Sequence, residues 1–230
     1  MRRFLLILCV LLLTIGSTGL ANATSVSLDA SATFQDITGA DRFRITNNST
    51  PSDFPGMLIV EAMIDLSTAA GDLVFDRYDP VPSYQSSPNT GFEGFTFSDF
   101  VTVGSVSNRY AKTLTMTFNY GSSSVFNSGE TFTFWVDLDP WSGSTYSGNI
   151  SGAEFAGTEL NVTFKPGYNL PYFAPITLTG IYEADGQCLT AYTSVHGELP
   201  NPVPEPATML LFGTGLTGLA GIGRKKLLKK

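Results

Sequence analysis

The chain has 230 residues, of which 43% are hydrophobic, and a formal net charge of −7. Of its 20 acidic and 13 basic side chains, one acidic residue (Glu205) and seven basic ones lie at the two ends. Residues 24–203 therefore keep 19 acidic and six basic side chains, a net charge of −13. This length suffices for one domain with a sizeable core. Its acidity excludes nucleic acid as a partner, because the phosphates would be repelled.

The N-terminus has the three parts of a secretory signal peptide. A basic region at Met1–Arg3 precedes a continuous apolar stretch over residues 4–13, and Ala21 and Ala23 fit a small-x-small cleavage site. We therefore expect the secretion translocon to export the chain and a signal peptidase to remove residues 1–23.

Residues 24–197 form the exported body, which shows strand patterns throughout. The clearest are 113–120 and 131–138, where apolar and polar residues alternate, so that one face meets the core and the other meets solvent. Shorter strands are predicted over residues 26–34, 43–46, 57–66, 73–75, 92–106, 159–164, 176–182 and 189–195.

The segments between these strands are predicted loops, the longest being 76–91, 121–129 and 140–152. No stretch of the body has the pattern of a strong amphipathic helix. Many short strands with turn signals between them predict an all-β fold. We expect an antiparallel β-sandwich of the jelly-roll or immunoglobulin-like type.

A group of acidic residues offers a candidate metal site. Asp137 and Asp139 lie two apart at the end of a predicted strand, so their side chains point the same way. Glu154 follows after a Gly- and Ser-rich loop. Carboxylates on a flexible loop suit calcium, although their spacing matches neither an EF-hand nor a Gly/Asp repeat. The alternative is a set of solvated charges that keeps a strand end soluble.

Aromatic residues near the same strand offer a candidate glycan-binding site. Trp135 lies opposite the apolar stripe of its strand, and Trp141 and Tyr146 follow in the next loop. Exposed aromatic rings stack on the apolar faces of sugars. The alternative is that a loop or a second sheet covers them, because large aromatic residues are buried on average.

The body lacks the usual signatures of catalysis. It contains no G-x-S-x-G, no H-E-x-x-H and no phosphate-binding loop. His196 is the only histidine, and Cys188 is the one cysteine left after signal removal, so no intrachain disulfide can form. We expect Cys188 to be an inert thiol rather than a nucleophile paired with His196. The sequence therefore favours a protein that is not an enzyme and that needs no cofactor.

The C-terminal residues are predicted to form a membrane-crossing segment. After a linker at 198–203, Pro204, Glu205 and Pro206 precede an uncharged, Gly-rich apolar run over 207–223. As a helix this run would reach roughly 25 Å, the short end of a bilayer crossing. The basic residues behind it should stay on the cytoplasmic side, because Lys and Arg resist translocation. These basic residues are Arg224, Lys225, Lys226, Lys229 and Lys230.

This tail resembles the PEP-CTERM sorting signal of Gram-negative bacteria. The likeness covers Val203 to Lys229 and has its three parts in order: Pro-Glu-Pro, a hydrophobic segment and a basic end. The resemblance implies an exosortase as partner, processing near the Pro-Glu-Pro triplet, and a host that makes an exopolysaccharide or biofilm matrix. The alternative is a plain C-terminal anchor helix.

These patterns together predict where the protein goes. The precursor would sit in the inner membrane with its body in the periplasm, and the mature form would reach the cell surface or the extracellular matrix. There we expect a structural or adhesive role. A glycan-binding module of the matrix is the first alternative, and an enzyme acting on the matrix polysaccharide is the second.

Overall fold

The computed structural model describes residues 26–37, 41–50, 57–78, 81–87, 90–121, 123–167, 174–186 and 189–199. These residues belong to one compact unit, Val26–Leu199. The predicted signal peptide, Cys188, the predicted linker from residue 200 onward and the sorting motif lie outside the described residues. Within the described ranges, no helix is both long and apolar enough to cross a membrane.

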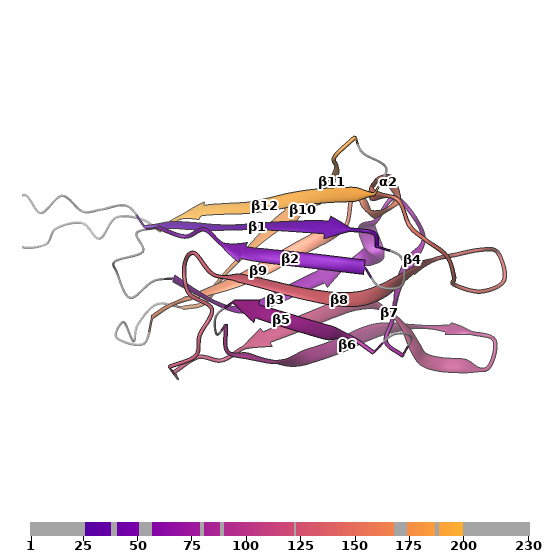
Figure 1. Cartoon of the computed structure of the whole chain (residues 1–230), viewed down its shortest axis with the longest axis horizontal. Helices are drawn as coiled ribbons and strands as arrows, with labels where there is room; N and C mark the ends of the chain where they lie inside the picture. Colours follow the sequence, from indigo (N-terminus) through magenta and orange to yellow (C-terminus); the bar gives the residue numbers. More distant parts are fainter. Residues whose placement is uncertain are drawn as a thin grey trace, which may run out of the picture. The chain divides into compact units, whose positions relative to one another are not determined.

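The body consists of two layers of antiparallel strands (Figure 1). The first layer contains, in spatial order, β11 (Glu183–Ala184), β12 (Thr190–Glu198), β1 (Ser27–Gln35), β2 (Asp41–Asn47), β8 (Thr131–Pro140) and β5 (Ser83–Ser87). The second contains β10 (Ile176–Ile181), β9 (Glu159–Pro166), β3 (Met57–Asp65), β7 (Val106–Phe118) and β6 (Phe92–Val103). The prediction of an all-β, antiparallel fold is confirmed.

The short strand β4 (Leu73–Asp76) joins the two layers. All four of its residues are buried. It pairs with β8 along its whole length and with β7 through Phe75 and Asp76. The two layers are therefore parts of one continuous sheet that folds over on itself, and not the two separate sheets of the predicted sandwich. A buried apolar strand at this place removes the free edges that β7 and β8 would otherwise expose.

The opposite edges of the layers also approach each other, so the body is nearly a closed barrel. A Cβ added to Gly180 of β10 would lie 2.7 Å from the carbonyl oxygen of Ser194 in β12. Only glycine allows the backbones to come so close.

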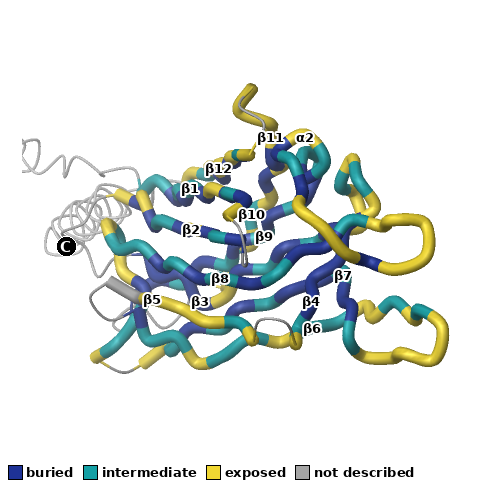
Figure 2. Tube along the Cα trace, turned by 45° about the vertical axis from the view of Figure 1, so that its right-hand side comes forward, coloured by how far each residue is buried: buried dark blue, intermediate teal, exposed yellow. Residues whose placement is uncertain are grey.

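The interior is rich in phenylalanine, because apolar residues occupy alternate positions of the long strands. Phe43 stacks on Phe134 at 4.8 Å between ring centroids, and Phe34 stacks on Phe155 at 4.2 Å. Phe155 comes from the short helix α2 (Gly152–Phe155), which crosses one end of the barrel. Figure 2 shows these buried stretches inside the body and exposed residues mainly in the loops and outer strands.

Two predicted boundaries were wrong. The predicted loop over 76–91 contains strand β5, which pairs with β8. The predicted strand over 92–106 is broken by a tight turn at Gly104, after which β7 begins at Val106. Gly104 has a φ of +61°, which glycine adopts without strain. From the sequence alone, a single glycine inside a long stretch of strand-forming residues was not enough to predict this turn.

Candidate functional site

Three carboxylates gather where β4 pairs with β8. Asp76 lies opposite Asp137, and Val74 lies opposite Asp139. One carboxylate oxygen from each of Asp76, Asp137 and Asp139 lies within 4.8 Å of the others. The predicted common direction of Asp137 and Asp139 is therefore found in the structure. The sequence did not point to Asp76, because only the β4–β8 pairing brings it to this place.

The carboxylate of Asp76, one of the three in this acidic cluster, already accepts hydrogen bonds from Arg109 and from the backbone. Both Arg109 Nε, at 2.7 Å, and Arg109 Nη2 donate to Asp76 Oδ2. The backbone N–H of Tyr78 donates to Asp76 Oδ1 at 3.0 Å. The Asp76 side chain is only 1% exposed, and its hydrogen bonds raise the pKa of Arg109. Asp76 and Arg109 thus form an ion pair between a buried carboxylate and a partly exposed guanidinium, and this pair links β4 to β7.

Glu154, the third residue of the predicted metal site, has another role. Its carboxylate accepts hydrogen bonds from the backbone N–H and the Oγ of Ser151, both at 2.8 Å. The Oγ of Ser151 in turn accepts from the Glu154 N–H at 3.2 Å. This reciprocal capping box begins helix α2. The carboxylate cluster that the structure assembles is therefore Asp76, Asp137 and Asp139, without Glu154.

A second pair of carboxyl groups lies at the end of the β1–β2 pairing. Asp36 and Asp41 are both buried, and the backbone N–H of Leu138 donates to Asp41 Oδ2 at 2.8 Å. Burial raises the pKa of Asp41 to about 8, and the negative charges of Asp36 and Asp137 add to the effect. Burial also raises the pKa of Asp36. Asp41 is thus protonated at neutral pH and donates to Asp36. Its burial keeps this pair away from a large substrate.

The three predicted glycan-binding aromatics have different surroundings. Trp141 is 43% exposed and Trp135 is half-buried, but Tyr146 is only 6% exposed. Tyr146 packs edge-on against Trp141 at 5.0 Å, and its hydroxyl donates to Asp72 Oδ1 at 3.2 Å. Burial, with Asp72 as a lesser cause, raises the pKa of Tyr146 to about 12.

These aromatics do not make one platform. Trp135 and Trp141 are six residues apart on an extended segment, which corresponds to roughly 20 Å. Tyr146 is buried against Trp141, so its own ring is not available for stacking on a sugar. Trp141 is therefore the most exposed of the three residues.

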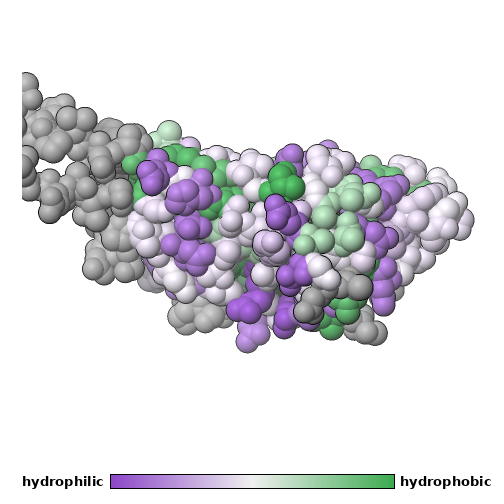
Figure 3. Space-filling view, turned by 90° about the horizontal axis from the view of Figure 1, so that it is seen from above, coloured by the Kyte–Doolittle hydropathy of each residue, from purple (hydrophilic) through white to green (hydrophobic). Residues whose placement is uncertain are grey.

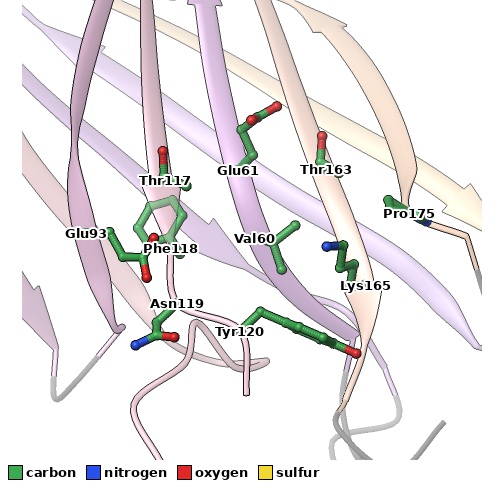
Figure 4. A pocket seen from close by; sticks show the side chains of 10 residues that line it. All are labelled: Val60, Glu61, Glu93, Thr117, Phe118, Asn119, Tyr120, Thr163, Lys165 and Pro175. Carbon is green, nitrogen blue, oxygen red and sulfur yellow. The ribbon is translucent and has the colours of Figure 1, made fainter. Parts of the chain in front are cut away.

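A separate groove of about 410 Å³ lies on the outer face of the second layer (Figure 4). Its floor is a row of side chains from three adjacent strands, in which Glu61 of β3 lies between Thr117 of β7 and Thr163 of β9. The row continues at one end to Gly94 of β6, which pairs with Thr117. A Cβ on Gly94 would meet no atom within 4 Å, so this end of the row is open.

Two irregularities of the strands shape the groove. The pairing of β3 with β9 shifts between Ile59 and Glu61, and the pairing of β6 with β7 shifts between Phe92 and Gly94. The extra residues at these shifts, Val60 and Glu93, both line the groove. A bulge redirects a side chain that regular alternation would point elsewhere, and bulges often lie beside binding sites. Sequence periodicity does not reveal such a shift.

Tyr120 closes one end of the groove together with Asn119 (Figure 4). The ring of Tyr120 is 40% exposed. Its hydroxyl donates to the carbonyl oxygen of Pro166 at 3.1 Å, and Lys165 Nζ lies 5.0 Å from its centroid. The ring is therefore held in place while part of it remains open to solvent.

The outer surface is polar over the face seen from above. Figure 3 shows hydrophobic residues there as separate patches among hydrophilic ones. The body carries an excess of acidic groups, and outward-facing threonines of neighbouring strands bond to each other, as Thr163 does to Thr177 at 3.0 Å. The described residues therefore form an all-β domain whose face in Figure 3 is mostly polar.

In the comparisons with known proteins, the match lies in the C-terminal segment of the chain. A family model of the PEP-CTERM protein-sorting motif matches residues 202–226. The chain is therefore a protein with a PEP-CTERM sorting domain, and the resemblance inferred from Pro204, Glu205, Pro206 and the residues after them is confirmed. The motif implies that the protein is exported and sorted by an exosortase. No curated protein and no solved structure matches the chain.

Proposed function

We propose that this chain is a non-enzymatic protein of the cell surface or extracellular matrix, whose β-rich body has a structural or adhesive role in the biofilm. The sorting motif at 202–226 is the observation that carries the proposal, because it directs the body out of the cell. Within the proposal, a signal peptide at 1–23 starts export, the helix at 207–223 holds the precursor in the inner membrane, and exosortase processing releases or transfers the body.

The properties of the body support this role. The face seen in Figure 3 is mostly polar, and the continuous sheet leaves β7 and β8 without free edges where β4 pairs with them. Both features suit a protein that stays folded in a crowded matrix without pairing through its edges. The buried carboxyls of Asp36 and Asp41 belong to the interior and serve the fold.

The test is the intact mass and cell fractionation of the protein in hosts with and without the exosortase gene. We expect loss of the C-terminal segment, and release from the inner membrane, only where the enzyme is present. A chain with Pro204, Glu205 and Pro206 replaced by alanine should keep Lys230 and stay in the membrane. Pro200→Ala, outside the motif, is the matched control and should be processed normally. A tail that stays intact in both hosts would contradict the proposal and indicate a plain anchor.

A further inference from the structure

The geometry points to the groove on the outer face of β3, β6, β7 and β9 as a binding site for an uncharged polysaccharide. This inference rests on the proposed adhesive role and deepens it by naming the ligand class and the residues that bind it. The groove is distinct from the Trp135, Trp141 and Tyr146 region that the sequence suggested. Its volume of about 410 Å³ lies within the range of small-molecule sites.

Thr163 of the groove is bonded to Thr177, but four other polar side chains of the lining can take a ligand. In the described part of the structure, Glu61, Glu93 and Asn119 have no side-chain hydrogen bond or ion pair, and Lys165 contacts only the ring of Tyr120. Carboxylates accept, an ammonium donates, and an amide does both. A ligand that offers donors and acceptors on every side satisfies this mixture, and sugar hydroxyls do so.

Tyr120 supplies the apolar contact that such a ligand needs. Its hydroxyl bond to Pro166 and the adjacent Lys165 hold the ring, and 40% of the residue stays exposed. A fixed aromatic ring loses little conformational freedom when a sugar ring stacks on it. The two bulged residues, Val60 and Glu93, complete the lining beside it.

The charge of the groove selects against an anionic ligand. Glu61 and Glu93 outnumber Lys165, and residues 24–203 as a whole carry −13. Polysaccharides rich in uronate or sulfate would be repelled at low salt. The ligand class is therefore a neutral glycan chain lying across the strands.

The experiment measures the binding of the full chain, purified in a mild detergent, to a panel of neutral polysaccharides and to polygalacturonate, by affinity electrophoresis and calorimetry. We expect one or more neutral members to bind and polygalacturonate not to bind. Tyr120→Ala should weaken binding about tenfold, the loss of one stacking contact. Tyr120→Phe keeps the ring but loses the hydrogen bond to Pro166 that holds it, so this variant should bind more weakly than the parent and more tightly than Tyr120→Ala.

A second variant tests the groove without touching its polar groups. Gly94→Phe places a ring in the open space at the end of the floor row, where a Cβ meets no neighbour. It should abolish binding while the melting temperature stays unchanged. Tyr192→Ala removes an exposed tyrosine elsewhere, on β12, and should have no effect.

Three results would overturn the inference. These are an absence of binding to every neutral polysaccharide, binding that survives both Tyr120→Ala and Gly94→Phe, and binding lost in Trp141→Ala but kept in Tyr120→Ala. The last would place the glycan at the end of β8 instead. None of these results bears on exosortase sorting, which fractionation measures separately.

Discussion

Asp41 donates a hydrogen bond to Asp36 where β1 and β2 meet, and both carboxyl groups are buried. The backbone N–H of Leu138, on the neighbouring strand β8, binds the other side of Asp41. Asp41 therefore keeps its proton in the folded chain at neutral pH. Ionising Asp41 would place a second negative charge beside Asp36 and near Asp137.

This pair predicts a stability that falls as the pH rises. The pKa of Asp41 is about 8 in the folded chain and about 4 when unfolded. Between these values the folded state holds a proton that the unfolded state has released, so the free energy of unfolding decreases with pH, by up to about 1.4 kcal/mol per unit from this group. Above the folded pKa the contribution is constant.

Asp41→Asn tests this directly, because an amide keeps the acceptor for Leu138 and the donor to Asp36 but does not ionise. Urea unfolding between about pH 5 and 8 should show a flatter dependence than the parent, with the variant the more stable at the upper end. Asp185→Asn, an exposed control, should keep the parent slope. Equal slopes for Asp41→Asn and the parent would contradict the assignment.

The Asp76–Arg109 ion pair should contribute more to stability than the more exposed pair beside it. Arg109→Met leaves a carboxylate that is 1% exposed without its cation, which should lower the free energy of unfolding by about 1.5–3 kcal/mol. Lys112 pairs with Asp72, which is 56% exposed, so Lys112→Met should cost less than about 1 kcal/mol. Denaturant unfolding of the two variants measures the difference, and equal losses would contradict it.

Helix α2 should tolerate no side chain at its first residue. A Cβ on Gly152 would lie 2.0 Å from the carbonyl oxygen of Thr190, a backbone atom that cannot move aside alone. Gly152→Ala should therefore destabilise the body by about 3 kcal/mol. Gly94→Ala is the matched control and should change stability by less than about 0.5 kcal/mol, since its Cβ meets open space. Thermal unfolding compares them, and a neutral Gly152→Ala would be the contrary result.

The acidic cluster should respond weakly to calcium. Asp76, Asp137 and Asp139 are close enough to share an ion, but Arg109 and the Tyr78 N–H already bind the oxygens of Asp76. We therefore expect melting temperatures in calcium and in a chelator to agree within about 2 °C. A larger rise with calcium that disappears in Asp139→Asn would establish a calcium site here. Glu198→Gln, an exposed residue at the end of β12, controls for general charge effects.

The sequence by itself identified the sorting motif and the structural class of the body. The sorting tail is a contiguous motif, and period-two alternation, as in 131–138, is a local consequence of strand geometry. Both can therefore be recognised without knowing how distant segments meet. The common direction of Asp137 and Asp139 follows from the same geometry.

Only the tertiary structure decided which residues share a site. Asp76 meets Asp137 and Asp139 because β4 pairs with β8, and the fold buries the carboxyl groups of Asp36 and Asp41, which lie near each other in the sequence. Tyr146 is covered although its neighbour Trp141 is not. The groove depends on strand register and on bulges at Val60 and Glu93. Register and burial arise from contacts between residues far apart in the chain, so no local pattern contains them.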